Sequence, residues 1–142
     1  MKRFGVMLVM VSLLGTACSK EALLSEHVIT ARHHLEEMGF DVESIYEEGT
    51  YQVTKEDWES IHRAVPHEEI WSVQEGDVDD YMGKVLATVS VRVKNHPLDD
   101  AYNIGHTRVT VLLDEGQVIG GWTVPVSKDR DVIGGVFSLS GK

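Results

Sequence analysis

The sequence is short of the residues on which several classes of protein depend. It has one cysteine in 142 residues, which excludes a disulfide framework and a zinc site built from several cysteines. Three prolines and 13 glycines, with no long tract of either, exclude a collagen-like chain and a low-complexity linker. Basic residues number 13 against 23 acidic ones, so the formal net charge is −10. This charge has the wrong sign for binding a phosphate backbone, and we expect no nucleic-acid partner.

Catalytic motifs are also missing from the sequence. Neither a Gly-x-Ser-x-Gly nucleophile elbow nor a Gly-x-Gly-x-x-Gly phosphate loop occurs. Adjacent acidic pairs such as Glu36-Glu37 and Glu68-Glu69 diverge on a helix and point to opposite faces of a strand, so we interpret them as surface charges. We therefore name no catalytic residue and no cofactor. A catalytic site assembled from distant residues would leave no such local motif.

The N-terminus has the features of a signal peptide. Lys2 and Arg3 precede an apolar stretch, residues 4–14, which only Gly5 and Ser12 interrupt. At about 1.5 Å per residue, this stretch covers roughly half of a ~30 Å hydrocarbon layer. It is therefore too short for a permanent membrane-spanning helix.

The single cysteine lies directly behind this apolar stretch. The segment Leu14-Gly15-Thr16-Ala17-Cys18 resembles the lipobox of bacterial lipoproteins, although Gly15 stands where leucine is usual. The resemblance implies cleavage before Cys18, so that residues 1–17 are the signal peptide and lipid (diacylglyceryl, palmitate) modifies Cys18. Two or more acyl chains hold a protein stably on a membrane. The expected location is the cell membrane or outer membrane, facing outside the cytoplasm, and the alternative is an ordinary secretory signal with an incidental Cys18.

Cleavage before Cys18 changes the charge of the remaining chain. It removes Lys2 and Arg3 and no acidic residue, so the formal net charge goes from −10 to −12. A charge of this size favours solubility and opposes close approach to anionic lipid headgroups. We expect residues 18–142 to form a single domain that stands off the membrane on a short N-terminal tether.

The first half of this domain is predicted to be helical with short extended pieces. A helix is expected from Ser19 to Met38, ended by Gly39, with one apolar face made of Leu24, Val28, Ala31, Leu35 and Met38. A short extended segment from Phe40 to Ile45, a turn at Glu47–Thr50 and a short strand at Tyr51–Val53 follow. A second helix is expected to begin at the capping pair Thr54 and Asp57, to bury Trp58, Ile61, Ala64 and Val65, and to end at Pro66. The segment from Ile70 to Val73 is predicted to be either a strand or a turn. Glu75–Asp80 is predicted to be either a loop or the start of a helix.

The second half is predicted to be strands. Residues 85–94 alternate between valine or alanine and mostly polar residues, which is typical of a strand covered on one face. Residues 108–126 are expected to form a hairpin that turns at Asp114–Gln117. The inward side chains are expected to be Val85, Ala87, Val89, Val91, Val93, Val109, Val111, Leu113, Trp122 and Val124. Gly120-Gly121 indicates a bulge or a bend, and Gly135–Leu139 an additional edge strand.

This order of elements predicts the fold class. Helices followed by an antiparallel meander give an α+β domain, with the N-terminal helices packed on one face of a sheet of about three to five strands. The chain is also loosely similar to small envelope modules of the PepSY type. In those modules a helix precedes strand pairs joined by an acidic residue and glycine, as at Asp114-Glu115-Gly116. That similarity implies an interaction or inhibitory module outside the cytoplasm.

Histidine is the one residue type that is unusually abundant, with seven in the chain. The candidates for a metal site are His62, His67 and Glu68, which lie around Pro66 and are of types that zinc accepts. The alternative is that these histidines are surface or partly buried side chains. The segment Asp77–Tyr81 begins like a calcium loop but has Tyr81 at the third ligand position.

Two further features of the sequence have either a structural role or a role in recognition. The polar segment Asn95–Asp100 is either a recognition loop or a connector. Trp58 and Trp122 are expected in the core, whereas Trp71 is a candidate to line a groove. The function that we expect is a membrane-anchored lipoprotein whose non-catalytic domain binds another protein, and the alternative is a lipoprotein that binds a small molecule or a metal.

Overall fold

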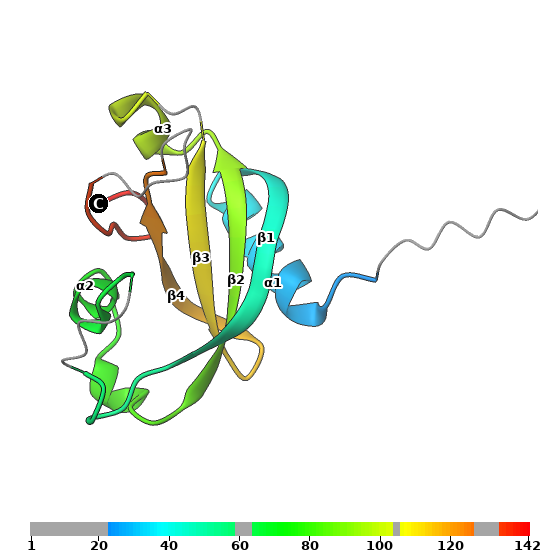
Figure 1. The fold of residues 1–142 in the computed structure, drawn as a ribbon. Coiled ribbons are helices and arrows are strands. Elements are labelled where there is room, and N and C mark those ends of the chain that lie inside the picture. Colours follow the sequence, from blue (N-terminus) through cyan, green and yellow to red (C-terminus); the bar gives the residue numbers. More distant parts are fainter. Residues whose placement is uncertain (1–22, 59–63, 104–105, 127–133) are drawn as a thin grey trace, which may run out of the picture.

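The computed structural model describes residues 23–58, 64–103, 106–126 and 134–142. Along the chain the elements are α1 (Glu26–Glu37), β1 (Asp41–Gln52), α2 (His67–Ser72), the 3-10 helix η1 (Val78–Asp80), β2 (Val85–Lys94), α3 (Pro97–Ala101), β3 (Thr107–Asp114) and β4 (Gln117–Val124). The four strands form one antiparallel sheet in the order β1-β2-β3-β4, and α1 contacts all four (Figure 1). The predicted α+β fold is confirmed. Within the described ranges no helix is long and apolar enough to cross a membrane.

Helix α1 is shorter than predicted. The Ser25 side chain caps its N-terminus by accepting the Val28 N–H at 3.2 Å. Gly39 ends it with φ +91°, and the Phe40 N–H donates to the Leu35 carbonyl at 3.1 Å, which is the usual glycine-terminated helix end.

The apolar face of α1 is confirmed at its centre and wrong at its ends. Val28, Ala31 and Leu35 are buried, as expected. Leu24 and Met38 are 47% and 37% exposed, because both lie outside the helix.

Strand β1 replaces three separate predicted pieces. The turn expected at Glu47–Thr50 is wrong, because these residues continue the strand and Gly49 pairs with Thr88 of β2. Two irregularities in register, between Val42 and Ser44 and between Ile45 and Glu47, bend the strand. Acidic residues are tolerated here because β1 is an edge of the sheet and most of its side chains face solvent.

The second predicted helix is wrong in the part that the structure describes. Thr54 and Asp57 do bond reciprocally, the Thr54 N–H to Asp57 Oδ1 at 2.7 Å and the Asp57 N–H to Thr54 Oγ1 at 3.4 Å, but they close a turn. Ala64 and Val65 are not helical, and Ile61 lies outside the described residues. Pro66 precedes a helix instead of ending one, because proline is compatible with a helix N-terminus but not with a helix interior. The helix that Pro66 precedes, α2, includes Ile70 and Trp71. The sequence predicts either a strand or a turn for these two residues, and both alternatives are wrong.

Strand β2 has the bounds that the sequence predicts, but both of its faces are covered. Val89, Val91 and Val93 are fully buried against α1. Leu86 on the opposite face is also buried, in a second cluster with Ile70, Trp71 and Tyr51, so the one-sided sheet is wrong. Val85, at the strand end, is 62% exposed. The sheet thus lies between α1 and the segment that contains α2 (Figure 1).

The hairpin of β3 and β4 turns at Glu115 and Gly116, as predicted. Val109, Val111 and Leu113 are buried beneath α1. Trp122, however, pairs with Thr110 and lies on the other face with the second cluster, because the shift in register between Leu112 and Leu113 changes the alternation along β4. The predicted placement of Trp122 and Val124 on the α1 face of the sheet is therefore wrong.

The outer edge of β4 is covered in two places. The Gln74 side chain accepts the Gly121 N–H and donates to the Gly121 carbonyl, both at 2.8 Å. Further along, Thr123 forms a single bridge with Phe137, so the edge strand predicted at Gly135–Leu139 is reduced to one paired position.

Candidate functional site

A pocket of about 270 Å³ opens on the face of the sheet opposite α1. We call it the sheet pocket. Residues of all four strands and of the segment before α2 line it: Glu47, Thr50, Tyr51, Ala64, Val65, Thr88, Ser90, Arg108, Thr110, Trp122 and Val124.

The floor of the sheet pocket is a pair of hydroxyls. Ser90 and Thr110 face each other across β2 and β3, and their side-chain oxygens lie 2.8 Å apart. Both residues are buried, and Thr88 lies two positions along the same face of β2. The expectation that the polar face of residues 85–94 is uncovered is thus wrong at Ser90.

The rim carries an exposed ion pair. Nη2 of Arg108 lies 2.8 Å from Oε1 of Glu47, and the guanidinium lies 5.3 Å from the centroid of the Tyr46 ring. The side chains of Arg108 and Glu47 are 38% and 65% exposed. An exposed pair of this kind contributes little to stability, so the guanidinium can exchange this partner for an incoming group at small cost.

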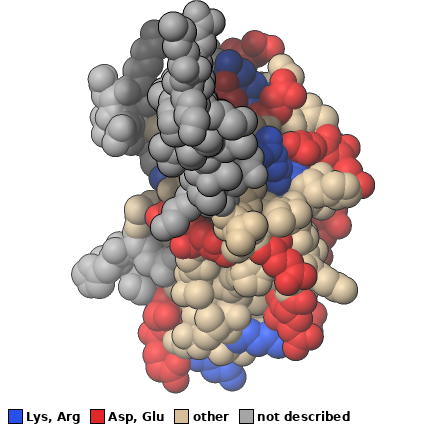
Figure 2. All heavy atoms as spheres, turned by 90° about the vertical axis from the view of Figure 1, so that its right-hand side faces the viewer, with Lys and Arg blue, Asp and Glu red and all other residues tan. Residues whose placement is uncertain are grey.

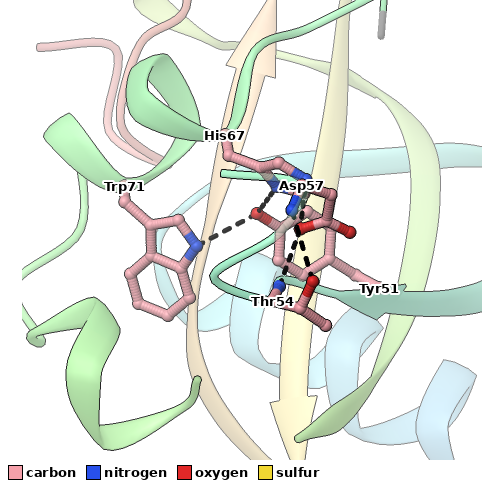
Figure 3. A network of polar contacts seen from close by, with 5 residues as sticks. All are labelled: Tyr51, Thr54, Asp57, His67 and Trp71. Atoms are coloured by element: carbon pink, nitrogen blue, oxygen red, sulfur yellow. Dashed lines mark hydrogen bonds and ion pairs between the residues drawn. The ribbon is translucent and has the colours of Figure 1, made fainter. Parts of the chain in front are cut away.

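The aromatic wall consists of Tyr51 and Trp122, whose ring centroids lie 5.9 Å apart. Behind this wall the Tyr51 hydroxyl accepts the indole N–H of Trp71 at 3.0 Å and lies 2.6 Å from Nδ1 of His67 (Figure 3). Both helical partners come from α2, so this network holds α2 against the end of β1.

The same network fixes the orientation of His67, which is fully buried. Trp71 Nε1 is only a donor, so the Tyr51 oxygen accepts from it, and the Tyr51 hydroxyl also contacts Nδ1 of His67. Nε2 of His67 faces Oδ1 of Asp57 at 3.7 Å (Figure 3). Trp58 stacks on the imidazole, with ring centroids 6.4 Å apart and planes 10° apart. This arrangement holds the Tyr51 ring in its place in the pocket wall.

The candidate metal ligands are not brought together in the part that the structure describes. His67 is buried with Nδ1 bonded to Tyr51, whereas Glu68 is exposed on α2. His62 and Cys18 lie outside the described residues. Within the described ranges no group of three His, Cys, Asp or Glu is placed to hold a metal ion.

Other residues that the sequence singles out have structural positions. The segment Asn95–Asp100 caps and forms α3, with His96 at the N-cap. Trp58 is half-buried, and Trp71 is buried but lines a shallow groove beside α2. The acidic pair Glu68-Glu69 is exposed, as predicted.

Further ion pairs join β1 to β2. Lys94 and Arg92 of β2 lie 2.6 Å and 3.0 Å from the Glu43 carboxylate. The hydrogen bond from Lys94, together with the positive charges of Lys94 and Arg92, holds the pKa of Glu43 below its ordinary value, against a smaller opposite effect of burial.

Figure 2, which faces the side of the molecule that carries β1 and α1, shows many acidic side chains and fewer basic ones. The charge imbalance of the sequence is thus carried by the surface.

The pocket residues have almost no signature in the sequence. Tyr51, Arg108 and Trp122 are far apart in the chain, and the strand register alone brings them to one face. The one local sign is Arg108, the only basic side chain in β3.

No family model, no curated protein and no solved structure matches the chain.

Proposed function

We propose that this chain is a lipid-anchored protein of the bacterial envelope whose acidic α+β domain binds another protein through the sheet pocket. The single observation that supports binding at this place is the set of side chains that meet there. Tyr51, Trp122 and Arg108 are the residue types that contribute most often to the energetic centres of protein interfaces.

The size of the site and the net charge of the chain support a protein partner with a basic surface. The volume of about 270 Å³ is that of a pocket for one or two side chains, and lies just below the roughly 300–1,000 Å³ of typical small-molecule sites. The formal net charge of −10, or −12 after cleavage before Cys18, favours a partner with a basic surface.

The anchor rests on the sequence. Cys18 follows the apolar stretch, and the first helix of the domain begins eight residues later at Glu26. Expression of the full-length chain in bacteria tests it: the protein should enter the detergent phase and resist salt washing, and Cys18→Ser should be released or left unprocessed. Equal membrane retention of Cys18→Ser with normal cleavage would contradict the anchor.

Photo-cross-linking in cells tests the binding face. A photoreactive side chain at Thr50, which is exposed and lines the pocket, should give a discrete adduct with another protein. The same group at Ile29, 55% exposed on α1, should not. Arg108→Ala should abolish the adduct, whereas Arg32→Ala, which removes a comparable exposed ion pair on α1, should leave it. Equal adducts from both positions, or no protein adduct at Thr50, would contradict the proposal.

The hydroxyl floor favours a second candidate, a small polar ligand. Ser90 and Thr110 offer donors and acceptors at the base of the pocket. In that case irradiation of the Thr50 variant should add the mass of a small molecule to the intact chain and give no protein adduct.

A further inference from the structure

The C-terminal segment, residues 135–142, lies against the outer edge of β4, and we call it the C-terminal strap. The Thr123 N–H donates to the Phe137 carbonyl at 2.8 Å, and the Phe137 N–H donates to the Thr123 carbonyl at 3.0 Å. The Thr123 hydroxyl also donates to the Ser138 carbonyl at 3.1 Å. The strap therefore satisfies backbone groups that an edge strand would otherwise leave open.

A buried histidine holds the other side of the strap. His96, only 2% exposed, donates from Nε2 to the Leu139 carbonyl at 2.9 Å. Its Nδ1 accepts the N–H of Leu98 at 3.2 Å and so caps α3. A carbonyl only accepts and an N–H only donates, so these two contacts require the neutral imidazole with its proton on Nε2.

We propose that His96 is an acid-sensitive latch, which holds the C-terminal strap on β4 while its imidazole is neutral and releases it when Nδ1 takes up a proton. The added proton points at the Leu98 N–H, so the cap of α3 is lost. The imidazolium also brings a charge into a buried site, where a charged group is costly. Both effects favour a conformation in which His96 leaves its site and the Leu139 carbonyl loses its donor.

The groups around His96 support a closed latch at neutral pH. Asp99 of α3 is a charged neighbour, but its carboxylate already accepts the backbone N–H of His96 and the hydroxyl of Thr107. From the other elements, the Phe40 ring lies 4.7 Å from the imidazole, and Leu139 and Gly141 of the strap carry no charge. Lys94, at the end of β2, is exposed and paired with Glu43.

The direction of the pKa shift agrees with this geometry. Burial lowers the pKa of His96 below its ordinary value, and the Leu139 bond and the Asp99 charge oppose this only in part. The latch is therefore closed at neutral pH and opens under acidic conditions.

Opening changes the surface beside β4. The strap residues Ser138, Leu139 and Ser140 form one wall of a groove of about 590 Å³, whose other side includes Gly120 and Gly121. Release of the strap removes this wall and frees the N–H and C=O of Thr123. An edge with open backbone groups can pair with another extended segment.

Hydrogen exchange by NMR on the full-length chain in detergent micelles, between pH 7.5 and pH 5, tests the latch. After correction for intrinsic rates, protection of the Thr123 and Phe137 amides should fall by up to about tenfold for each pH unit between the ordinary histidine pKa of 6.5 and the lower pKa of His96 in the closed latch. The Gly121 amide is the internal control, because the neutral side chain of Gln74 holds it at the same strand edge. Its protection should change much less.

Two variants and one direct titration complete the test. His96→Gln should remove the pH dependence of the Phe137 amide, and His33→Gln, at an exposed histidine on α1, should leave it. If His96→Gln does not fold, the imidazole of the unmodified chain can be titrated by its own NMR signals. Titration of His96 without loss of protection at Phe137, or the same loss in His96→Gln, would overturn the proposal.

Discussion

The Tyr51 hydroxyl lies 2.6 Å from Nδ1 of His67, 16 positions further along the chain, and this contact joins β1 to α2. The same oxygen accepts the indole N–H of Trp71. One hydroxyl thus holds two side chains of a six-residue helix that is too short to be stable alone.

Removal of this hydroxyl should be costly. Tyr51→Phe keeps the ring but takes the hydroxyl from His67 and Trp71 in a buried site, so the free energy of unfolding should fall by about 1–3 kcal/mol. Tyr46→Phe, at a tyrosine that is 47% exposed, should change it by less than about 0.5 kcal/mol. Urea unfolding of the two variants measures the difference. Equal effects would mean that the network does not stabilise the packing of α2.

The buried face of β2 gives a second prediction. Val91→Asp puts an unpaired charge where the side chain is fully buried and should largely unfold the domain. Val85→Asp makes the same change on the same strand, at a valine that is 62% exposed, and should be tolerated. Thermal melts followed by circular dichroism would show the contrast. Similar melting of both variants would contradict the assigned facing of the strand.

The glycines of β4 give a third prediction. A Cβ at Gly121, where φ is +155°, would collide with the Thr110 carbonyl and press on Leu139, so Gly121→Ala should destabilise the domain by more than about 2 kcal/mol. A Cβ at Gly135 would meet no neighbouring atom within 4 Å, so Gly135→Ala should have little effect. Chemical denaturation measures both. A neutral Gly121→Ala would show that β4 can move away from β3.

The pKa of His96 predicts how stability depends on pH. Because this pKa is lower in the folded chain than its ordinary value of 6.5, the unfolded chain binds more protons as the solution is acidified. The contribution of His96 is complete above about pH 6.5 and is lost as the pH falls toward the folded-state pKa. Unfolding free energies at pH 7.5 and pH 5 should therefore differ more for the unmodified chain than for His96→Gln. Parallel pH profiles would contradict the neutral buried imidazole.

The elements that can be predicted from the sequence are those whose pattern is local. The alternation of valines predicts β2 with the bounds that it has, and the acidic-glycine turn predicts the hairpin of β3 and β4. Gly39 correctly marks the end of α1. Each of these signals is short-range, because side-chain alternation and positive φ are properties of neighbouring residues.

The remaining elements depend on contacts between distant residues. Glu47 to Thr50 have the composition of a turn, yet pairing with β2 extends them as a strand. Pro66 is equally compatible with the end of one helix and the start of another. Simple alternation puts Trp122 on the wrong face, because the irregularity in β4 shifts the pattern by one residue.

The candidate site is less predictable than the fold. The sequence marks His67 as a candidate metal ligand, but its actual neighbours, Tyr51 and Asp57, come from β1 and from the turn that follows it. The sheet pocket exists only because Ser90, Thr110 and Trp122 align across three strands. No spacing along the chain encodes such an alignment.

The lipid anchor can be tested by mass spectrometry of the N-terminal peptide of the full-length protein purified from bacterial membranes. We predict that Cys18 is the first residue and that its mass includes a diacylglyceryl group. An unmodified Cys18 thiol, either with residues 1–17 still attached or after cleavage at another position, would contradict a lipid-anchored binding domain.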